Sequence, residues 1–346
     1  MAALARISPL VIGLTVVAFG TSAPELTVST ISAFEGNSEI ALGNVVGSNI
    51  LNILLILGIS ALIVPLTVQT QLLRFDVPLL IGVSIFTWVV GFDGRIGTFD
   101  GALLVAGLVF YVIWSIRASR KESAAVQAEY EEEYGAEAVG ASNGGWRSLA
   151  TSLALTIAGL ALLVLGSDWF VEGAIEVATL LGMSDLVIGL TIVAAGTSLP
   201  EVFTSVVAAI KGERDIAVGN VIGSNLFNLL CVLGISGLTS DLMGFGGISV
   251  PDKALRFDLI VMTAAAIACL PIFFTGHVIS RWEGGLFLAY EVIYTTWLIV
   301  AETHHPSLGS FQYAVLVFAL PLTVMVLLVD VYRHARRGRS LESGGG

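Results

Sequence analysis

The chain has 346 residues, of which 55% are hydrophobic and only 12% are charged, and its formal net charge is −11. Soluble domains carry about 25% charged residues, and apolar stretches of about 20 residues recur along this chain, which indicates a helical membrane protein that crosses the bilayer several times. The chain has 16 basic and 27 acidic residues and no basic stripe, so we expect no nucleic acid partner.

The apolar runs, taken in chain order, predict an all-α, polytopic membrane protein with about ten transmembrane helices. The predicted helices cover residues 8–33, 40–64, 75–92, 99–117, 149–172, 184–210, 215–239, 256–275, 284–301 and 310–332. The sequence therefore predicts a first membrane repeat over 1–117, an acidic cytoplasmic linker over 118–148 and a second membrane repeat over 149–303. An extra C-terminal transmembrane helix and a basic tail follow over 304–346.

The division into repeats follows from a long internal duplication. Residues Val11 to Ser60 align with Val187 to Ser236 without a gap, and 29 of these 50 positions are identical. Five predicted helices separate equivalent points of the two copies. Because five is odd, the copies should lie in opposite orientations in the bilayer, as in the inverted-topology repeats of many secondary transporters.

The basic residues predict which side of the membrane each loop occupies. Arg117, Arg120, Lys121 and Arg147 flank or lie in the linker, which places it in the cytoplasm by the positive-inside rule. Most other basic residues at helix ends agree with this orientation. The exceptions are Arg95, Lys253 and Arg256.

Each copy of the duplicated sequence carries a proline followed by a glutamate inside its first apolar segment. Pro24 and Pro200 lack the backbone N–H of an unbroken helix and predict a weakened turn, which a simple packing kink would also explain. The adjoining Glu25 and Glu201 place carboxylates in the hydrocarbon region at roughly 3 kcal/mol each, and no lysine or arginine lies in the repeat cores. We therefore predict that the two carboxylates meet near the middle of the bilayer and bind a cation or a proton.

The second helix of each repeat adds amides and hydroxyls at intervals of four residues, which places them on one helix face. They are Asn44, Ser48 and Asn52 in the first copy and Asn220, Ser224 and Asn228 in the second. We expect the first asparagine of each trio to bond between helices, and the serine and second asparagine to coordinate an ion. Such oxygen ligands suit Ca²⁺ and disfavour soft metals. Glycine pairs in the same helices predict the close approach of another helix; they are Gly43 with Gly47 and Gly219 with Gly223.

The strings GTSAPE and GTSLPE, together with GNVVGSN and GNVIGSN, closely resemble those of the sodium/calcium exchanger family of cation/calcium antiporters. The resemblance covers nearly the whole chain. It implies a ten-helix core of two inverted five-helix repeats, with alternating access by sliding of the two gating helices that precede the repeats. It also implies a set of ion ligands. They are Thr21, Ser22, Glu25, Ser48 and Asn52, then Thr197, Ser198, Glu201, Ser224 and Asn228, with the backbone carbonyls of Ala18 and Ala194.

The resemblance further implies a multi-pass protein of the cell membrane that exchanges Na⁺ for Ca²⁺, has no cofactor and is not an enzyme. Two departures qualify it. Asn228 stands where several members of the family carry aspartate, which leaves two carboxylates and an open ion stoichiometry. The first repeat has no predicted counterpart of the helix over 149–172, and we expect either that the start of the chain is misassigned or that the product is truncated.

The sequence also bears on three other functions. A proton- or potassium-coupled cation antiporter is the alternative within transport. An intramembrane enzyme would need an acidic cluster or a nucleophile–base pair, and neither occurs near the repeats. An ion channel is disfavoured by the inverted duplication with a site near the midplane.

Overall fold

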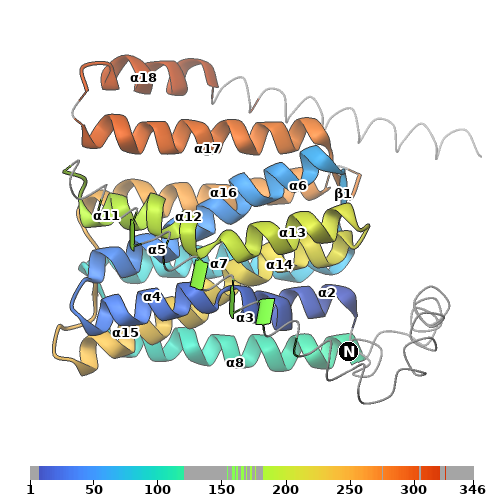
Figure 1. The fold of residues 1–346 in the computed structure, drawn as a ribbon, viewed down its shortest axis with the longest axis horizontal. Coiled ribbons are helices and arrows are strands. Elements are labelled where there is room, and N and C mark those ends of the chain that lie inside the picture. The colour runs from blue at the N-terminus through green and yellow to red at the C-terminus, as the bar shows by residue number, and fades with distance from the viewer. Residues whose placement is uncertain are drawn as a thin grey trace, which may run out of the picture.

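The computed structural model describes residues 8–120, 182–274, 276–303 and 305–319, with isolated helical positions between 154 and 176 and at 324. This part of the chain is almost entirely helical (Figure 1), which confirms the predicted all-α class. Within it, six helices are long and apolar enough to cross a membrane, or eight if each of two bent pairs forms one span. The linker over 118–148, the predicted helix over 149–172 and most of 304–346 lie outside the described residues. The domain boundaries, the number of ten crossings and the opposed orientation of the repeats stay predictions.

The first repeat forms four apolar spans, three of which contain a widened, π-helical turn. Their segments are α2 (Pro9–Ile12), η1 (Gly13–Val17), α3 (Ala18–Thr21) and α4 (Ala23–Phe34); α5 (Ser38–Leu51), η2 (Asn52–Leu57) and α6 (Gly58–Ile63); η3 (Leu72–Asp76), α7 (Val77–Val90) and η4 (Gly91–Asp93); and α8 (Thr98–Arg120). The observed ends agree with the predicted helices to within a few residues, because the apolar runs fix the span lengths.

The second repeat reproduces this order. Its segments are α11 (Asp185–Ile188), η5 (Gly189–Val193), α12 (Ala194–Thr197) and α13 (Leu199–Ile210); α14 (Arg214–Phe227), η6 (Asn228–Val232) and α15 (Leu233–Leu242); η7 (Ala254–Asp258) and α16 (Leu259–Phe274); and α17 (Arg281–Glu302). A further helix, α18 (Leu308–Ala314) with η8 (Val315–Ala319), begins the predicted extra segment and lies beside α17 (Figure 1). The π-helical segments recur at equivalent places, and η2 and η6 begin at the candidate ligands Asn52 and Asn228. Such widened turns are frequent at functional sites.

The second span of each repeat lies at the centre of the molecule. In the spans Ser38–Ile63 and Arg214–Leu242, 78% and 89% of the most apolar stretch is buried, against 22% in both α8 and α17. All of these helices are apolar on most faces. The two central spans therefore pack against protein, whereas α8 and α17 lie on opposite sides of the bundle, with α18 beyond α17 (Figure 1), and both present mostly apolar surface outward.

The two repeats interlock through reciprocal helix contacts. Helix α5 packs on η5 of the other repeat and α14 packs on η1, while α8 packs on α15 and α17 packs on α6. Glycines make the central contacts possible. A Cβ atom on Gly47 would lie 2.4 Å from the carbonyl oxygen of Leu190, and one on Gly223 would lie 2.5 Å from that of Leu14. The close approach predicted from the glycine pairs is confirmed.

Two short antiparallel ribbons, which the apolar pattern did not predict, also join the repeats. Strand β1 (Leu66–Thr67) pairs with β4 (Val278–Ile279), and β2 (Arg95–Ile96) pairs with β3 (Ile248–Ser249). Each ribbon joins a loop of one repeat to a loop of the other. Two residues per strand are too few to show an alternating pattern in the sequence.

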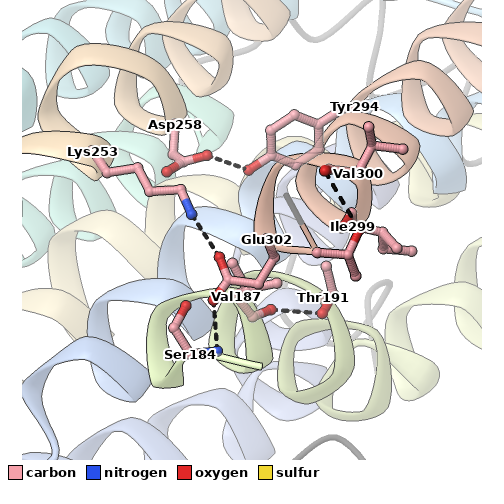
Figure 2. Close-up of polar contacts among 10 residues, drawn as sticks. Ser184, Val187, Thr191, Lys253, Asp258, Tyr294, Ile299, Val300 and Glu302 are labelled. Atoms are coloured by element: carbon pink, nitrogen blue, oxygen red, sulfur yellow. Dashed lines mark hydrogen bonds and ion pairs between the residues drawn. The ribbon is translucent and has the colours of Figure 1, made fainter. Parts of the chain in front are cut away.

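Polar contacts tie α17 to the other helices of the second repeat (Figure 2). The Tyr294 hydroxyl donates to Asp258 Oδ1 at 2.9 Å. At the end of α17, the Glu302 carboxylate accepts the backbone N–H of Ser184 at 2.8 Å and pairs with Lys253 Nζ at 2.8 Å. Glu302 thus joins the end of α17, the start of α11 and the start of η7. Lys253, an exception to the positive-inside pattern, has a partner here.

Candidate cation-binding site

The first span of each repeat is broken at a serine, and this break places a glutamate at the start of a new helix. Ser22 has φ −83° and ψ 12°, Ser198 has φ −82° and ψ 5°, and the helices on either side of each break differ in direction by 46°. The prolines fall in the first turn of α4 and α13, where a missing N–H leaves no helical bond unmade. Glu25 and Glu201 lie in the same turns, where the helix dipole stabilises negative charge.

The two glutamate side chains are fully buried and each is bonded by the opposite repeat. Ser198 Oγ donates to Glu25 Oε1 at 2.8 Å, and Ser22 Oγ donates to Glu201 Oε1 at 2.7 Å. Both carboxylates have 0% exposed surface, so neither faces lipid or bulk water. Glu25 and Glu201, which are 176 positions apart in the sequence, are therefore joined by hydrogen bonds to the same two helix breaks.

Several oxygen atoms of the candidate ligands are buried without a hydrogen-bond partner. The second carboxylate oxygens, Glu25 Oε2 and Glu201 Oε2, are buried and have no partner, and the same holds for Ser48 Oγ, Asn52 Oδ1 and both amide atoms of Asn228. A buried polar atom that stays unpaired costs about 1–3 kcal/mol. Ser224 Oγ donates to Glu201 Oε1 at 3.3 Å. The donor set of carboxylate, hydroxyl and amide oxygens fits a hard cation.

A second layer of hydrogen bonds fixes the broken helices against the central spans. Thr197 Oγ1 donates to Asn44 Oδ1 at 2.9 Å, and Thr21 Oγ1 lies 3.2 Å from Asn220 Oδ1 in the equivalent contact. The expectation that Asn44 and Asn220 bond between helices is confirmed. The two threonines therefore reach the site as links between repeats, and each keeps lone pairs on its hydroxyl oxygen.

Two serines of this layer were missed at the sequence level. Asn44 Nδ2 donates to Ser29 Oγ at 2.8 Å, and Asn220 Nδ2 donates to Ser205 Oγ at 2.9 Å. Ser29 and Ser205 are fully buried. Each stands four residues after its glutamate in both copies, which is the signal that could have found them, since that spacing returns to the same helix face.

The proposed backbone ligands each accept two hydrogen bonds within the helix, one from a backbone N–H and a longer one from a threonine hydroxyl, Thr21 Oγ1 at 3.4 Å and Thr197 Oγ1 at 3.3 Å. The carbonyl of Ala18 accepts the N–H of Ser22 at 2.9 Å, and that of Ala194 accepts the N–H of Ser198 at 3.0 Å. A carbonyl oxygen has two lone pairs, so a contact to a cation would replace the longer bond from the threonine hydroxyl.

Electrostatically, the two carboxylates face each other without a basic partner. Glu201 repels Glu25, and no lysine or arginine is among the described groups that act on either carboxylate. No three His, Cys, Asp or Glu side chains gather into a cluster anywhere in the described ranges. A cation at this place would therefore draw its remaining ligands from hydroxyl, amide and carbonyl oxygens.

Comparison with known proteins agrees with this architecture. A sequence model of the sodium/calcium exchanger protein family matches residues 1–117 and 151–300. The putative antiporter CaxA of Alkalimonas amylolytica is 40% identical over 269 residues, which cover 77% of this chain and 79% of that protein. The sodium/calcium exchanger MaX1 of Methanosarcina acetivorans is 34% identical over 314 residues, 83% of this chain and 88% of that protein.

A solved structure shows the same fold. The sodium-calcium exchanger NCX_Mj, soaked with 2.5 mM Na⁺ and 1 mM Sr²⁺, matches with a TM-score of 0.67 and 32% identity, covering 85% of this chain and 89% of that chain. These relatives are membrane transporters and not enzymes. The chain is accordingly a multi-pass membrane protein of the cation/calcium antiporter type, and it belongs to the sodium/calcium exchanger family.

Proposed function

We propose that this protein exchanges Na⁺ for Ca²⁺ across the cell membrane by alternating access, with both ions bound in turn around Glu25 and Glu201. The observation that carries the proposal is the pair of fully buried carboxylates, each bonded by a serine of the other repeat and neither paired with a base among the described residues. The names of the relatives MaX1 and NCX_Mj support Na⁺ and Ca²⁺ as the transported ions.

The ligands in this proposal are the side-chain oxygens already described and two backbone carbonyls. They are Glu25, Glu201, Thr21, Ser22, Thr197, Ser198, Ser48, Asn52, Ser224 and Asn228, with the carbonyls of Ala18 and Ala194. The unpaired oxygens of the glutamates, Ser48, Asn52 and Asn228 support this set most directly. The threonines and alanine carbonyls, which already make other bonds, contribute less.

Repulsion between the two carboxylates couples ion binding to movement. Two unit charges about 4 Å apart repel by about 4 kcal/mol at an effective dielectric constant of 20. An occluded state without ions would bury both charges uncompensated, which is strongly unfavourable. A site filled by cations is neutralised and can pass through the occluded state, so exchange is favoured over leak.

The reciprocal contacts of the repeats support two access states of similar energy. Helix α5 packs on η5 as α14 packs on η1, so exchanging the roles of the two repeats preserves the main contacts. States related in this way differ little in free energy, and a modest difference in ion affinity can shift their populations.

The test is Ca²⁺ uptake into proteoliposomes driven by an outward Na⁺ gradient. Glu25→Gln and Glu201→Gln should each abolish uptake, because the amide keeps the shape but removes the charge. Glu35→Gln is a matched control, since Glu35 lies exposed at the other end of α4 and its variant should transport normally. Undiminished uptake by the Glu25 and Glu201 variants would refute the site. Gradients of H⁺ and K⁺, imposed separately, identify the coupling ion if Na⁺ is ineffective.

A further inference from the structure

Glu291 is a carboxylate in the membrane interior that the candidate cation site does not use. It lies near the middle of the 22-residue apolar span Arg281–Glu302, so roughly 15 Å of helix separates it from either end. Its Oε1 accepts a hydrogen bond from Thr295 Oγ1 at 3.2 Å, and its Oε2 is buried without a partner. An ionised carboxylate at this depth is costly, so it calls for a cation or a proton to neutralise it.

The Glu291 side chain lies on the face of α17 that packs against the first repeat. A Cβ atom on Gly284 would lie 2.8 Å from the carbonyl oxygen of Gly58 and 3.1 Å from the backbone nitrogen of Leu62, and one on Gly58 would lie 2.9 Å from Leu288 Cγ. The two helices therefore run antiparallel. Glu291 follows Gly284 by seven residues and Leu288 by three, which returns it to the same face. Because α17 packs on both α6 and η2, Glu291 lies one turn beyond Gly58, opposite η2.

The first repeat shows that the fold does not require a carboxylate at this position. Tyr111 of α8 and Tyr294 of α17 donate hydrogen bonds to equivalent aspartates of the third span, which aligns the two helices at an offset of 183 positions. At this offset, Leu108 and Val112 take the places of the glutamate and its threonine. Both apolar side chains are partly buried against the core. Packing alone is thus served by leucine and valine, and the acid of the second repeat has another role.

The described surroundings of Glu291 supply no positive charge. Among the elements packed against α17, α6 and η2 carry no titratable side chain, whereas α11 begins with Asp185 and α18 carries the exposed Tyr313. The titratable side chains of α17 itself are Arg281, Glu283, Tyr290, Tyr294 and Glu302. From the start of the third span, Asp258 and Lys253 bond Tyr294 and Glu302. Within the described residues, no charged side chain acts on the Glu291 carboxylate.

A proton fits this place better than a metal ion. Ca²⁺ takes six to eight oxygen ligands, and the described side chains offer one hydroxyl, that of Thr295, beside the carboxylate. A proton requires only the free Oε2. We propose that Glu291 is a proton-binding site in the membrane interior, separate from the cation site, and that release of its proton is linked to cation binding. The link is η2, which lies opposite Glu291 and begins at the candidate ligand Asn52.

The sign of this linkage differs from that of the cation site itself. Ionised Glu291 buries an uncompensated charge, which draws water or a cation between α17 and η2 and displaces the segment that begins at Asn52. Rising pH should therefore weaken Ca²⁺ binding through Glu291. Glu25 and Glu201 give the opposite trend, because their ionisation favours a bound cation. The affinity of the unmodified protein for Ca²⁺ should rise with pH, pass through a maximum and fall again.

Infrared spectroscopy of the purified protein in lipid vesicles tests the proton site, because protonated carboxyl groups and carboxylates absorb at different frequencies. Glu291→Leu introduces the residue of the first repeat and should remove one protonated-carboxyl band at neutral pH while the protein stays folded. Glu291→Gln should remove the same band. Glu35→Gln, at an exposed position, is the matched control and should leave that band in place. If neither Glu291 variant loses a protonated-carboxyl band, the proposal is overturned.

Ca²⁺ binding at a series of pH values tests the linkage, which rests on the proposed function. The fall in affinity at alkaline pH should be present in the unmodified protein and in Glu35→Gln, and absent in Glu291→Leu. A lost infrared band together with an unchanged pH profile would retain the proton site and overturn the linkage. Absence of Ca²⁺ binding by the unmodified protein at every pH would refute the proposed function and the linkage, whereas the infrared result would still decide the proton site.

Discussion

Replacing Gly47 by alanine tests the closest contact between the repeats. A Cβ atom at this position would lie 2.4 Å from the carbonyl oxygen of Leu190 and 2.8 Å from Cβ of Ala194, whereas ordinary contacts lie at 3.4–4 Å. Both neighbours belong to the helix that leads to Ser198 and Glu201. The main obstacle is backbone, which cannot rotate away, so the two helices must separate by about 1 Å.

The size of the effect follows from two opposing contributions. Forcing an extra carbon into a packed interface costs about 1–3 kcal/mol, while alanine in place of glycine favours the helix by up to about 1 kcal/mol. We therefore expect a net loss of about 1–2 kcal/mol in the free energy of unfolding. At about 2–4 °C per kcal/mol, the unfolding midpoint should fall by several degrees. Ca²⁺ affinity should fall as well, because the displaced helix carries four of the twelve proposed ligands, Ala194, Thr197, Ser198 and Glu201.

Thermal unfolding in detergent is the assay, with Gly82→Ala as the matched control. Gly82 lies within α7 and a Cβ there would meet no atom within 4 Å, so its variant should be as stable as the unmodified protein or slightly more so. Gly223, Gly43 and Gly219 give a series, with nearest contacts of 2.5, 2.8 and 3.0 Å, along which destabilisation should decrease. Equal midpoints for the Gly47 and Gly82 variants would refute this account of the packing.

Two further predictions concern polar contacts of α17. Tyr294→Phe removes the hydroxyl that donates a hydrogen bond to the buried Asp258 and should lower the free energy of unfolding by about 1–3 kcal/mol, seen as a lower unfolding midpoint. Tyr313→Phe, at an exposed position, is the control and should leave the midpoint unchanged. Equal midpoints for the Tyr294→Phe and Tyr313→Phe variants would count against the bond. Lys253→Met breaks the ion pair with Glu302, in which the lysine side chain is 39% exposed, and should cost at most about 1 kcal/mol. The difference from the unmodified protein should shrink as choline chloride is added, and a difference unaffected by salt would point to packing instead.

Several features of the fold and the site could be predicted from the sequence because their causes are local. Apolar runs near the thickness of a bilayer fixed the helical spans, and the duplication of Val11 to Ser60 identified equivalent positions in the two repeats. Pro24 and Pro200 marked the helix breaks because proline cannot donate a backbone hydrogen bond. The cost of placing Glu25 and Glu201 in the membrane identified them as functional candidates.

Only the tertiary structure decided which groups meet across the repeats. The bond from Ser22 to Glu201 joins residues 179 positions apart, and no local pattern specifies such a partner. The same holds for Ser29 and Ser205, for the two β-ribbons and for the bridge that Glu302 makes to Lys253 and Ser184. Sequence periodicity determines which face of a helix is apolar or polar, but the partner of that face depends on how separate helices pack.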